Sequence, residues 1–82
     1  MSHFVYILQS LKDGKYYIGE TSDVAKRLLF HNNGLQRSTR SRIPFVIVYT
    51  EKFPDRTEAL KREKQIKSYK GGAAFQKLLR EM

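Results

Sequence analysis

The 82-residue sequence contains no cysteine, few acidic side chains and no long apolar run. The absence of cysteine excludes disulfide bonds and thiolate metal sites. No stretch of about 18 consecutive apolar residues is present, so a transmembrane helix is not expected. The first residues follow a strand pattern instead of a basic and apolar leader, so no signal peptide is expected either. These absences predict a soluble, cytoplasmic protein without a membrane partner.

Acidic side chains are outnumbered two to one by basic ones. Sixteen Lys and Arg against eight Asp and Glu give a net charge of +8 at pH 7. A surface with this charge favours polyanions, and we expect a nucleic acid partner, DNA in preference to RNA. The alternative is a basic domain that is merely soluble. A lipid surface is less well supported, because no helix pairs a basic face with a broad apolar stripe.

Two apolar runs near the N-terminus indicate a β-hairpin. Residues 3–10 and 15–21 are rich in Val, Ile, Tyr and Phe, as strands are. The Asp13-Gly14 pair between them is typical of a type I′ turn, which needs positive φ at both central positions. A loop of two or four residues would place Tyr6, Leu8, Tyr17 and Gly19 on one face of the sheet.

Each of these residues has a structural and a functional interpretation. The tyrosines can be packing residues with polar tips, which is the commoner role of a tyrosine in a strand. Gly19 lacks a side chain, and a glycine inside a strand often marks where a ligand or another backbone approaches closely. The hairpin therefore predicts that the two tyrosine side chains point to the same side of the sheet, next to Gly19, where another group can approach the backbone closely.

The rest of the chain predicts an α+β fold. Thr21, Ser22 or Asp23 can cap a helix that ends before Gly34, and residues 45–50 form a strand that is apolar on both faces. A helix follows from Asp55 to about Lys70, with the Asp55 and Glu58 pattern of a capping box. A last helix spans residues 73–80. We expect a single domain over residues 1–82, with a three-stranded antiparallel sheet, helices on both faces and the order β-β-α-β-α-α.

Two polar residues of the first helix border its buried stripe of Val24 and Leu28. Arg27 and His31 are four positions apart, so they share one side of the helix and lie near the sheet. The structural interpretation is a snorkelling arginine and a histidine that interacts with the helix dipole. The functional interpretation is a pair of site residues.

Glu63 interrupts the apolar stripe of the second helix. Ala59, Leu60 and Ile66 define this stripe, and helical spacing calls for an apolar residue at position 63. A buried carboxylate is rare unless it is paired or binds a metal. The competing interpretation is a salt bridge to Arg27 or to Lys67, four positions further on.

A basic loop and the second helix supply candidate phosphate contacts. Residues 35–43 cannot build a core, and their arginines and hydroxyl groups suit phosphate oxygens. A solvated surface loop would look much the same. The candidate nucleic-acid-binding residues are Arg37, Arg40, Arg42, Lys61, Lys64, Lys67 and Lys70.

Together these residues resemble the GIY-YIG endonuclease superfamily, in its small stand-alone bacterial form. The pattern is Val5-Tyr6-Ile7, Tyr17-Ile18-Gly19, Thr21, Arg27, His31 and Glu63, and it covers nearly the whole chain. Three positions depart from it: Phe4 replaces the first glycine, Glu20 replaces a lysine of some relatives, and Phe75 replaces an asparagine.

The resemblance implies a catalytic set. Tyr17 would be the general base that activates water, with Tyr6 orienting it. Arg27 would hold the scissile phosphate, His31 would support the proton network, and Glu63 would bind one Mg²⁺ or Mn²⁺ ion. A tyrosine, with an ordinary pKa of about 10, needs nearby cations to act as a base near neutrality.

The leading hypothesis is a metal-dependent endonuclease that hydrolyses phosphodiester bonds in DNA, with selectivity for DNA structure of the kind used in DNA repair. The alternative is a non-catalytic DNA- or RNA-binding module that retains the fold and the basic surface. The sequence does not determine the oligomeric state. Paired carboxylates for glycoside chemistry, a Ser-His-Asp arrangement and a Gly-rich phosphate loop are not apparent.

Overall fold

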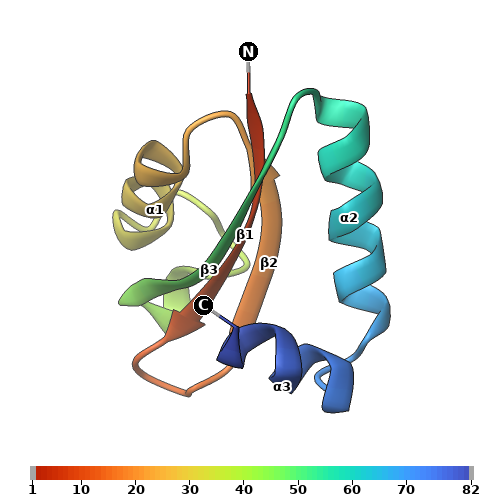
Figure 1. The fold of residues 1–82 in the computed structure, drawn as a ribbon. Helices are drawn as coiled ribbons and strands as arrows, with labels where there is room; N and C mark the ends of the chain where they lie inside the picture. The colour runs from red at the N-terminus through yellow and green to blue at the C-terminus, as the bar shows by residue number, and fades with distance from the viewer. Residues whose placement is uncertain (1, 82) are drawn as a thin grey trace.

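A computed structural model describes residues 2–81 of the chain (Figure 1). Its elements confirm the expected α+β fold and the order β-β-α-β-α-α. They are β1 (His3–Ser10), β2 (Tyr16–Thr21), α1 (Val24–Asn32), a 3-10 turn (Arg40–Arg42), β3 (Phe45–Phe53), α2 (Arg56–Ser68) and α3 (Ala73–Arg80). None of the helices in the described part of the chain is long and apolar enough to cross a membrane.

The three strands form one antiparallel sheet in the order β2-β1-β3. β1 is therefore central, and β2 is an edge strand. Helix α1 lies on one face of the sheet, and α2 and α3 lie on the other (Figure 1). This arrangement confirms the prediction that both faces are covered, which the apolar strand β3 indicated.

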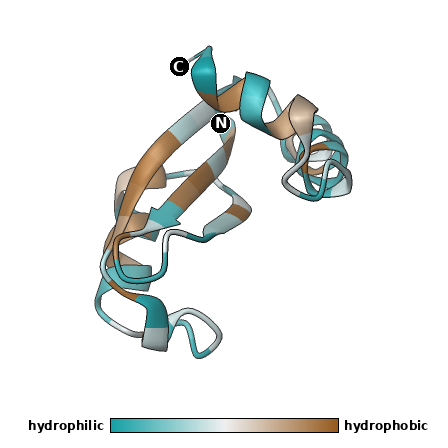
Figure 2. Cartoon of the chain, turned by 90° about the horizontal axis from the view of Figure 1, so that it is seen from below, coloured by the Kyte–Doolittle hydropathy of each residue, from teal (hydrophilic) through white to brown (hydrophobic). Residues whose placement is uncertain are grey.

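Each face of the sheet carries its own apolar cluster, and the strands are the most hydrophobic elements (Figure 2). On the α2 and α3 side, the buried members are Val5, Ile7, Ala59, Ile66, Phe75 and Leu78. On the α1 side, they are Tyr6, Leu8 and Phe45, against which Tyr17, Val24, Leu28, Ile43 and Ile47 pack. Alternate residues of β1 thus serve different faces, as the pleat of a strand requires.

The hairpin register confirms that the two tyrosines share a face. Tyr6 lies opposite Gly19, and Leu8 lies opposite Tyr17. The Ser10 N–H group donates to the Lys15 carbonyl at 2.9 Å, which closes a loop of the four residues 11–14. The hairpin at Asp13-Gly14 is confirmed with the longer of the two expected loops, but its turn is not of type I′, because Gly14 has positive φ and Asp13 does not. A longer loop needs only one residue in the left-handed region.

The residues that cap the helices are among those predicted from the sequence, and the C-terminal end of α2 differs slightly from the predicted one. The Asp23 and Asp55 side chains accept hydrogen bonds from backbone N–H groups at the starts of α1 and α2. Helix α2 ends at Ser68 instead of about Lys70, because Lys70 already has a φ of 50°. Leu60 was predicted in the buried stripe of α2, and this is wrong: it is 41% exposed.

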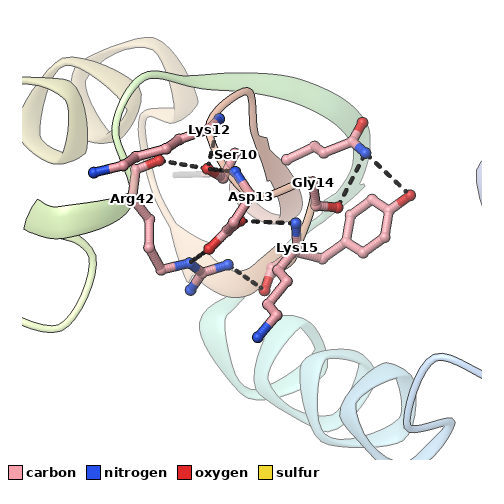
Figure 3. Close-up of polar contacts among 8 residues, drawn as sticks. Ser10, Lys12, Asp13, Gly14, Lys15 and Arg42 are labelled. Carbon is pink, nitrogen blue, oxygen red and sulfur yellow. Dashed lines mark hydrogen bonds and ion pairs between the residues drawn. The ribbon is translucent and has the colours of Figure 1, made fainter.

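The loop between α1 and β3 is held against the hairpin by Arg42 (Figure 3). Its Nε donates to Asp13 at 3.0 Å, and its guanidinium also reaches the Tyr16 carbonyl at 3.4 Å. The Ser10 hydroxyl donates to the Arg42 carbonyl from the other side. The prediction that residues 35–43 build no core is wrong, because Thr39 is 0% exposed and Ile43 packs on the α1-side cluster.

Candidate active site

Tyr6, Tyr17 and His31 form an aromatic cluster on the α1 face of the sheet, next to the edge strand β2. The ring centroids of Tyr17 and His31 are 4.7 Å apart, and those of Tyr6 and Tyr17 are 6.4 Å apart. The Tyr6 hydroxyl oxygen lies 3.4 Å from His31 Nε2. The structure therefore brings together three residues that are widely separated in the sequence.

Tyr6 occupies the space that Gly19 leaves open. A Cβ atom at position 19 would overlap the Tyr6 hydroxyl and would lie 2.5 Å from its Cζ. The sequence predicted close approach of a ligand or another backbone at this glycine, and the group that approaches is instead the Tyr6 side chain. Tyr6 is only 2% exposed, whereas Tyr17 is half-buried and borders solvent. Of the two hydroxyls, that of Tyr17 is the one more accessible to water.

Burial and the neighbouring charges keep the Tyr6 hydroxyl protonated. Burial raises the pKa of Tyr6 well above its ordinary value, and Tyr17 adds to the rise. The Arg27 cation opposes this effect, while the Glu63 and Glu20 carboxylates raise the pKa of Tyr6 further. Tyr6 therefore acts as a hydrogen-bonding group and not as a base near neutrality.

His31 is buried in the cluster and neutral near pH 7. It is 1% exposed, and its Nδ1 lies 2.9 Å from the Thr39 hydroxyl oxygen. Burial lowers the pKa of His31, and the Arg27 cation lowers it further. A neutral imidazole has one nitrogen that donates and one that accepts. His31 can thus connect two polar groups across the cluster.

Arg27 combines a link to the cluster with access from solvent. Its guanidinium lies over the Phe30 ring at 5.2 Å, and its charge acts on both Tyr6 and His31. It also lines an open pocket of about 330 Å³, together with Thr21, Ser22, Asp23, Lys26 and Phe30. The Asp23 carboxylate is engaged in capping α1 and the Thr21 hydroxyl in bonds to the Asp23 backbone, which leaves the two cations and Ser22 for an anionic group such as a phosphate.

Glu63 lies on the α2 side, and its carboxylate is paired with a lysine. The side chain is 17% exposed, and Lys67 Nζ donates to it at 2.6 Å. This is one of the salt bridges that the sequence left open as an explanation for a carboxylate in the apolar stripe. The charge of Glu63 nevertheless acts on Tyr6, so it lies within electrostatic range of the cluster.

Glu20 is a second carboxylate near the cluster. It is paired with His3 at 2.6 Å and with Arg56 at 3.4 Å, and its side chain is 8% exposed. The described residues contain no group of three or more His, Cys, Asp and Glu side chains that could hold a metal ion by themselves. A divalent ion held here would need oxygen atoms from water and from a substrate.

Some side chains among the candidate phosphate contacts are exposed, and others already make hydrogen bonds or ion pairs within the protein. Arg37 and Lys64 are exposed. Arg40 donates to the Gly34 carbonyl, Arg42 is held by Asp13, and Lys61 faces Glu58 at 3.6 Å. Lys67 and Lys70 border an open pocket of about 370 Å³ on the α2 side. The arginines thus belong to the loop between α1 and β3, and the lysines belong to α2 and the turn that follows it.

Thr39 is the site residue that the sequence did not single out. Its hydroxyl was expected, like those of Ser38 and Ser41, to face phosphate, but the structure buries it against His31. Thr39 is eight positions from His31 and lies in a loop, so no helix or strand periodicity links the two. A signal for this contact is absent from a single sequence.

Comparison with known protein families assigns the chain to a nuclease superfamily. Residues 2–74 match the model of the GIY-YIG catalytic domain, so the chain belongs to the GIY-YIG family. Bacterial proteins are similar to this chain over most of their length. A UPF0213 protein of Staphylococcus saprophyticus is 44% identical over 68 residues, which cover 82% of each chain. A UPF0213 protein of Staphylococcus epidermidis is 46% identical over the same share.

A protein of solved structure is similar in sequence. The solution NMR structure of a UPF0213 protein from Bacillus halodurans has 40% sequence identity, covers 90% of each chain and gives a TM-score of 0.49.

Proposed function

We propose that the protein is a metal-dependent endonuclease that hydrolyses phosphodiester bonds in DNA, with selectivity for branched or otherwise irregular DNA. The observation that supports this most strongly is the contact between Tyr6, Tyr17 and His31 at an edge of the sheet, with the Arg27 cation acting on two of them. Packing alone does not call for a neutral histidine and a buried hydroxyl to meet there.

The residues of the chain divide the work between them. Tyr17, half-buried and next to His31, is the general base that takes a proton from water. Tyr6, which stays protonated, orients the reacting groups through its hydroxyl. Arg27 lines a pocket open to solvent and holds the scissile phosphate, where its charge stabilises the extra negative charge of the transition state.

Glu63 fits a divalent ion that is shared with the substrate. Mg²⁺ is commonly held by one or two carboxylates, several waters and substrate phosphates, so one partly exposed carboxylate suffices. The Lys67 ammonium, 2.6 Å from this carboxylate, would have to give way to the ion. When bound, Mg²⁺ or Mn²⁺ would add positive charge at the phosphate and lower the barrier to its hydrolysis.

The second candidate function is a non-catalytic DNA- or RNA-binding module. The observation in its favour is the same Lys67 ion pair, because it gives Glu63 a structural partner that needs no metal. The net charge of +8 serves both functions equally well.

A cleavage assay separates the two functions. Purified protein is incubated with nicked, branched, duplex and single-stranded DNA, and with matching RNA, in Mg²⁺, in Mn²⁺ and in a chelator. We expect metal-dependent cleavage of at least one irregular DNA substrate. Tight binding without cleavage of any substrate would support the binding module instead.

A further inference from the structure

Thr39 joins His31 to the loop that follows α1. Its hydroxyl oxygen lies 2.9 Å from His31 Nδ1 and 3.3 Å from the Gln36 carbonyl oxygen. On the far side of the imidazole, Nε2 lies 3.4 Å from the Tyr6 hydroxyl oxygen. The four groups form a continuous chain of hydrogen bonds from the loop backbone to the tyrosine cluster.

The Gln36 carbonyl determines which group donates and which accepts in this series of hydrogen bonds. A carbonyl oxygen can only accept, and a hydroxyl group has a single proton to donate. With that proton directed at the Gln36 carbonyl, the Thr39 oxygen accepts from His31. The imidazole nitrogen that faces Thr39, Nδ1, then carries the hydrogen, and Nε2 keeps its lone pair.

The contact with Tyr6 independently gives the same assignment of donor and acceptor to the two His31 nitrogens. The Tyr6 hydroxyl is buried, and among the described residues its hydrogen-bond partner is His31 Nε2. If Nε2 carried the hydrogen, the Tyr6 proton would have no acceptor there, and an unmatched buried donor is costly. Both ends of the chain therefore require the same tautomer.

We propose that Thr39 is a positioning residue that holds His31 as the Nδ1–H tautomer, so that Nε2 accepts the Tyr6 hydroxyl proton in a hydrogen bond. The Tyr6 hydroxyl is then held in one orientation by His31, with its oxygen lone pairs free, beside the Tyr17 side chain that activates water. This consequence for hydrolysis rests on the proposed function, whereas the tautomer follows from the geometry alone.

The tautomer can be measured in the free protein by ¹⁵N NMR of the imidazole nitrogens at about pH 8, where a histidine is neutral. His3 is the second of the two histidines, so the His3→Gln variant assigns the signals. We expect a protonated Nδ1 and an unprotonated Nε2 for His31. A protonated Nε2 in the wild type would overturn the proposal without any variant of Thr39.

Three variants then test whether Thr39 sets the tautomer. Thr39→Val keeps the shape and removes the hydroxyl, and it should shift His31 toward the Nε2–H form. Thr39→Ser keeps the hydroxyl and should preserve the wild-type signals. Thr57→Val makes the same exchange at an exposed position of α2 and should change nothing. An unchanged tautomer in folded Thr39→Val would overturn the proposal.

A further variant covers the case in which Thr39→Val does not fold. Tyr6→Phe removes the group that Nε2 accepts from and leaves Thr39 in place. We expect the Nδ1–H tautomer to persist in this variant. Its loss would show that Tyr6, and not Thr39, sets the tautomer, and would also overturn the proposal.

Kinetics give the functional readout. In single-site variants with an intact fold, Thr39→Val should lower kcat by about tenfold or more, the scale for losing a group that orients a histidine. KM should change little, and Thr39→Ser should restore kcat. Wild-type kcat in Thr39→Val despite an altered tautomer would overturn the link to hydrolysis. If the wild type cuts nothing, the proposed function fails, and the NMR result still decides the tautomer.

Discussion

Gly19 lies directly opposite Tyr6 in the pairing of β1 with β2, and the Tyr6 ring fills the space that a side chain at position 19 would need. The two residues are complementary: the missing side chain of one makes room for the hydroxyl of the other. This hydroxyl in turn reaches His31. Gly19 therefore allows the Tyr6 ring to reach the position from which its hydroxyl contacts His31.

The first prediction follows from this relationship. Gly19→Ala should displace the Tyr6 ring and lower the free energy of unfolding by about 1–3 kcal/mol, as expected for overpacking a tight site. Chemical denaturation measures the loss, and NMR of the Tyr6 ring measures the displacement. Gly14→Ala is the control for the ring position, because an alanine at this positive φ is strained but no atom lies within 4 Å of its Cβ. An unmoved Tyr6 ring in Gly19→Ala would contradict the geometry.

The second prediction concerns pH. Burial lowers the pKa of His31, so the unfolded chain binds a proton at a higher pH than the folded chain does. The free energy of unfolding should therefore fall as the pH drops below about 6.5, the ordinary value for histidine. Chemical denaturation at several pH values should show this fall in His3→Gln and a smaller one in His31→Gln. Equal falls in both variants would contradict a buried, neutral His31.

The third prediction concerns Lys67 and metal binding. Lys67 competes with a divalent ion for the Glu63 carboxylate, so Lys67→Met should raise the affinity for Mn²⁺ by about two- to fivefold. Mn²⁺ titration followed by electron paramagnetic resonance measures this without DNA. Lys61→Met is the matched control, because Lys61 faces Glu58 on the same helix. An affinity in Lys67→Met no higher than that in Lys61→Met would show that the ion does not bind at Glu63.

The fourth prediction separates two arginines of one loop. Arg37 is exposed, and Arg37→Ala should weaken binding to all DNA sequences alike and reduce the salt slope by about one. With about five phosphate contacts, the wild-type slope of log affinity against log salt should be near −4.5. Binding that does not change with salt would contradict the electrostatic account.

Arg42 should behave differently, because Asp13 and the Tyr16 carbonyl hold it in place (Figure 3). Arg42→Ala should lower the melting temperature more than Arg37→Ala does. The two effects can be compared by differential scanning calorimetry and by DNA titrations at two salt concentrations. Equal melting temperatures would show that Arg42 does not fasten the loop to the hairpin.

Much of the fold could be predicted from the sequence because it depends on local signals. β1 and α3 have the predicted bounds, and Asp23 and Asp55 cap their helices. The alternation of β1 and the loop length were enough to place Tyr6 and Tyr17 on one face. Hydrophobic period, capping residues and turn length act within a few residues, so one sequence contains them in full.

The misses have a different physical origin. Leu60 has the spacing of a buried residue but is exposed, because α2 presents a narrow stripe of Ala59 and Ile66 to the sheet. From the sequence, Thr39 was expected to carry a surface hydroxyl. The structure instead buries it against His31, in the loop 35–43 that Arg42 links to the distant hairpin. Contacts of this kind join segments that are far apart in the chain, so no local sequence pattern predicts them.

The most direct test of the proposed chemistry is the single-turnover cleavage rate of Tyr17→Phe and Glu63→Gln on the substrate that the wild type cuts best. Each variant keeps its shape and should bind this DNA as the wild type does. Each should also cut it at least about a hundredfold more slowly, because a positioned base or a metal ligand is lost. The wild-type rate should rise with pH at saturating metal, and Tyr17→Phe should lose this rise. Wild-type rates in both variants would contradict the account of this site.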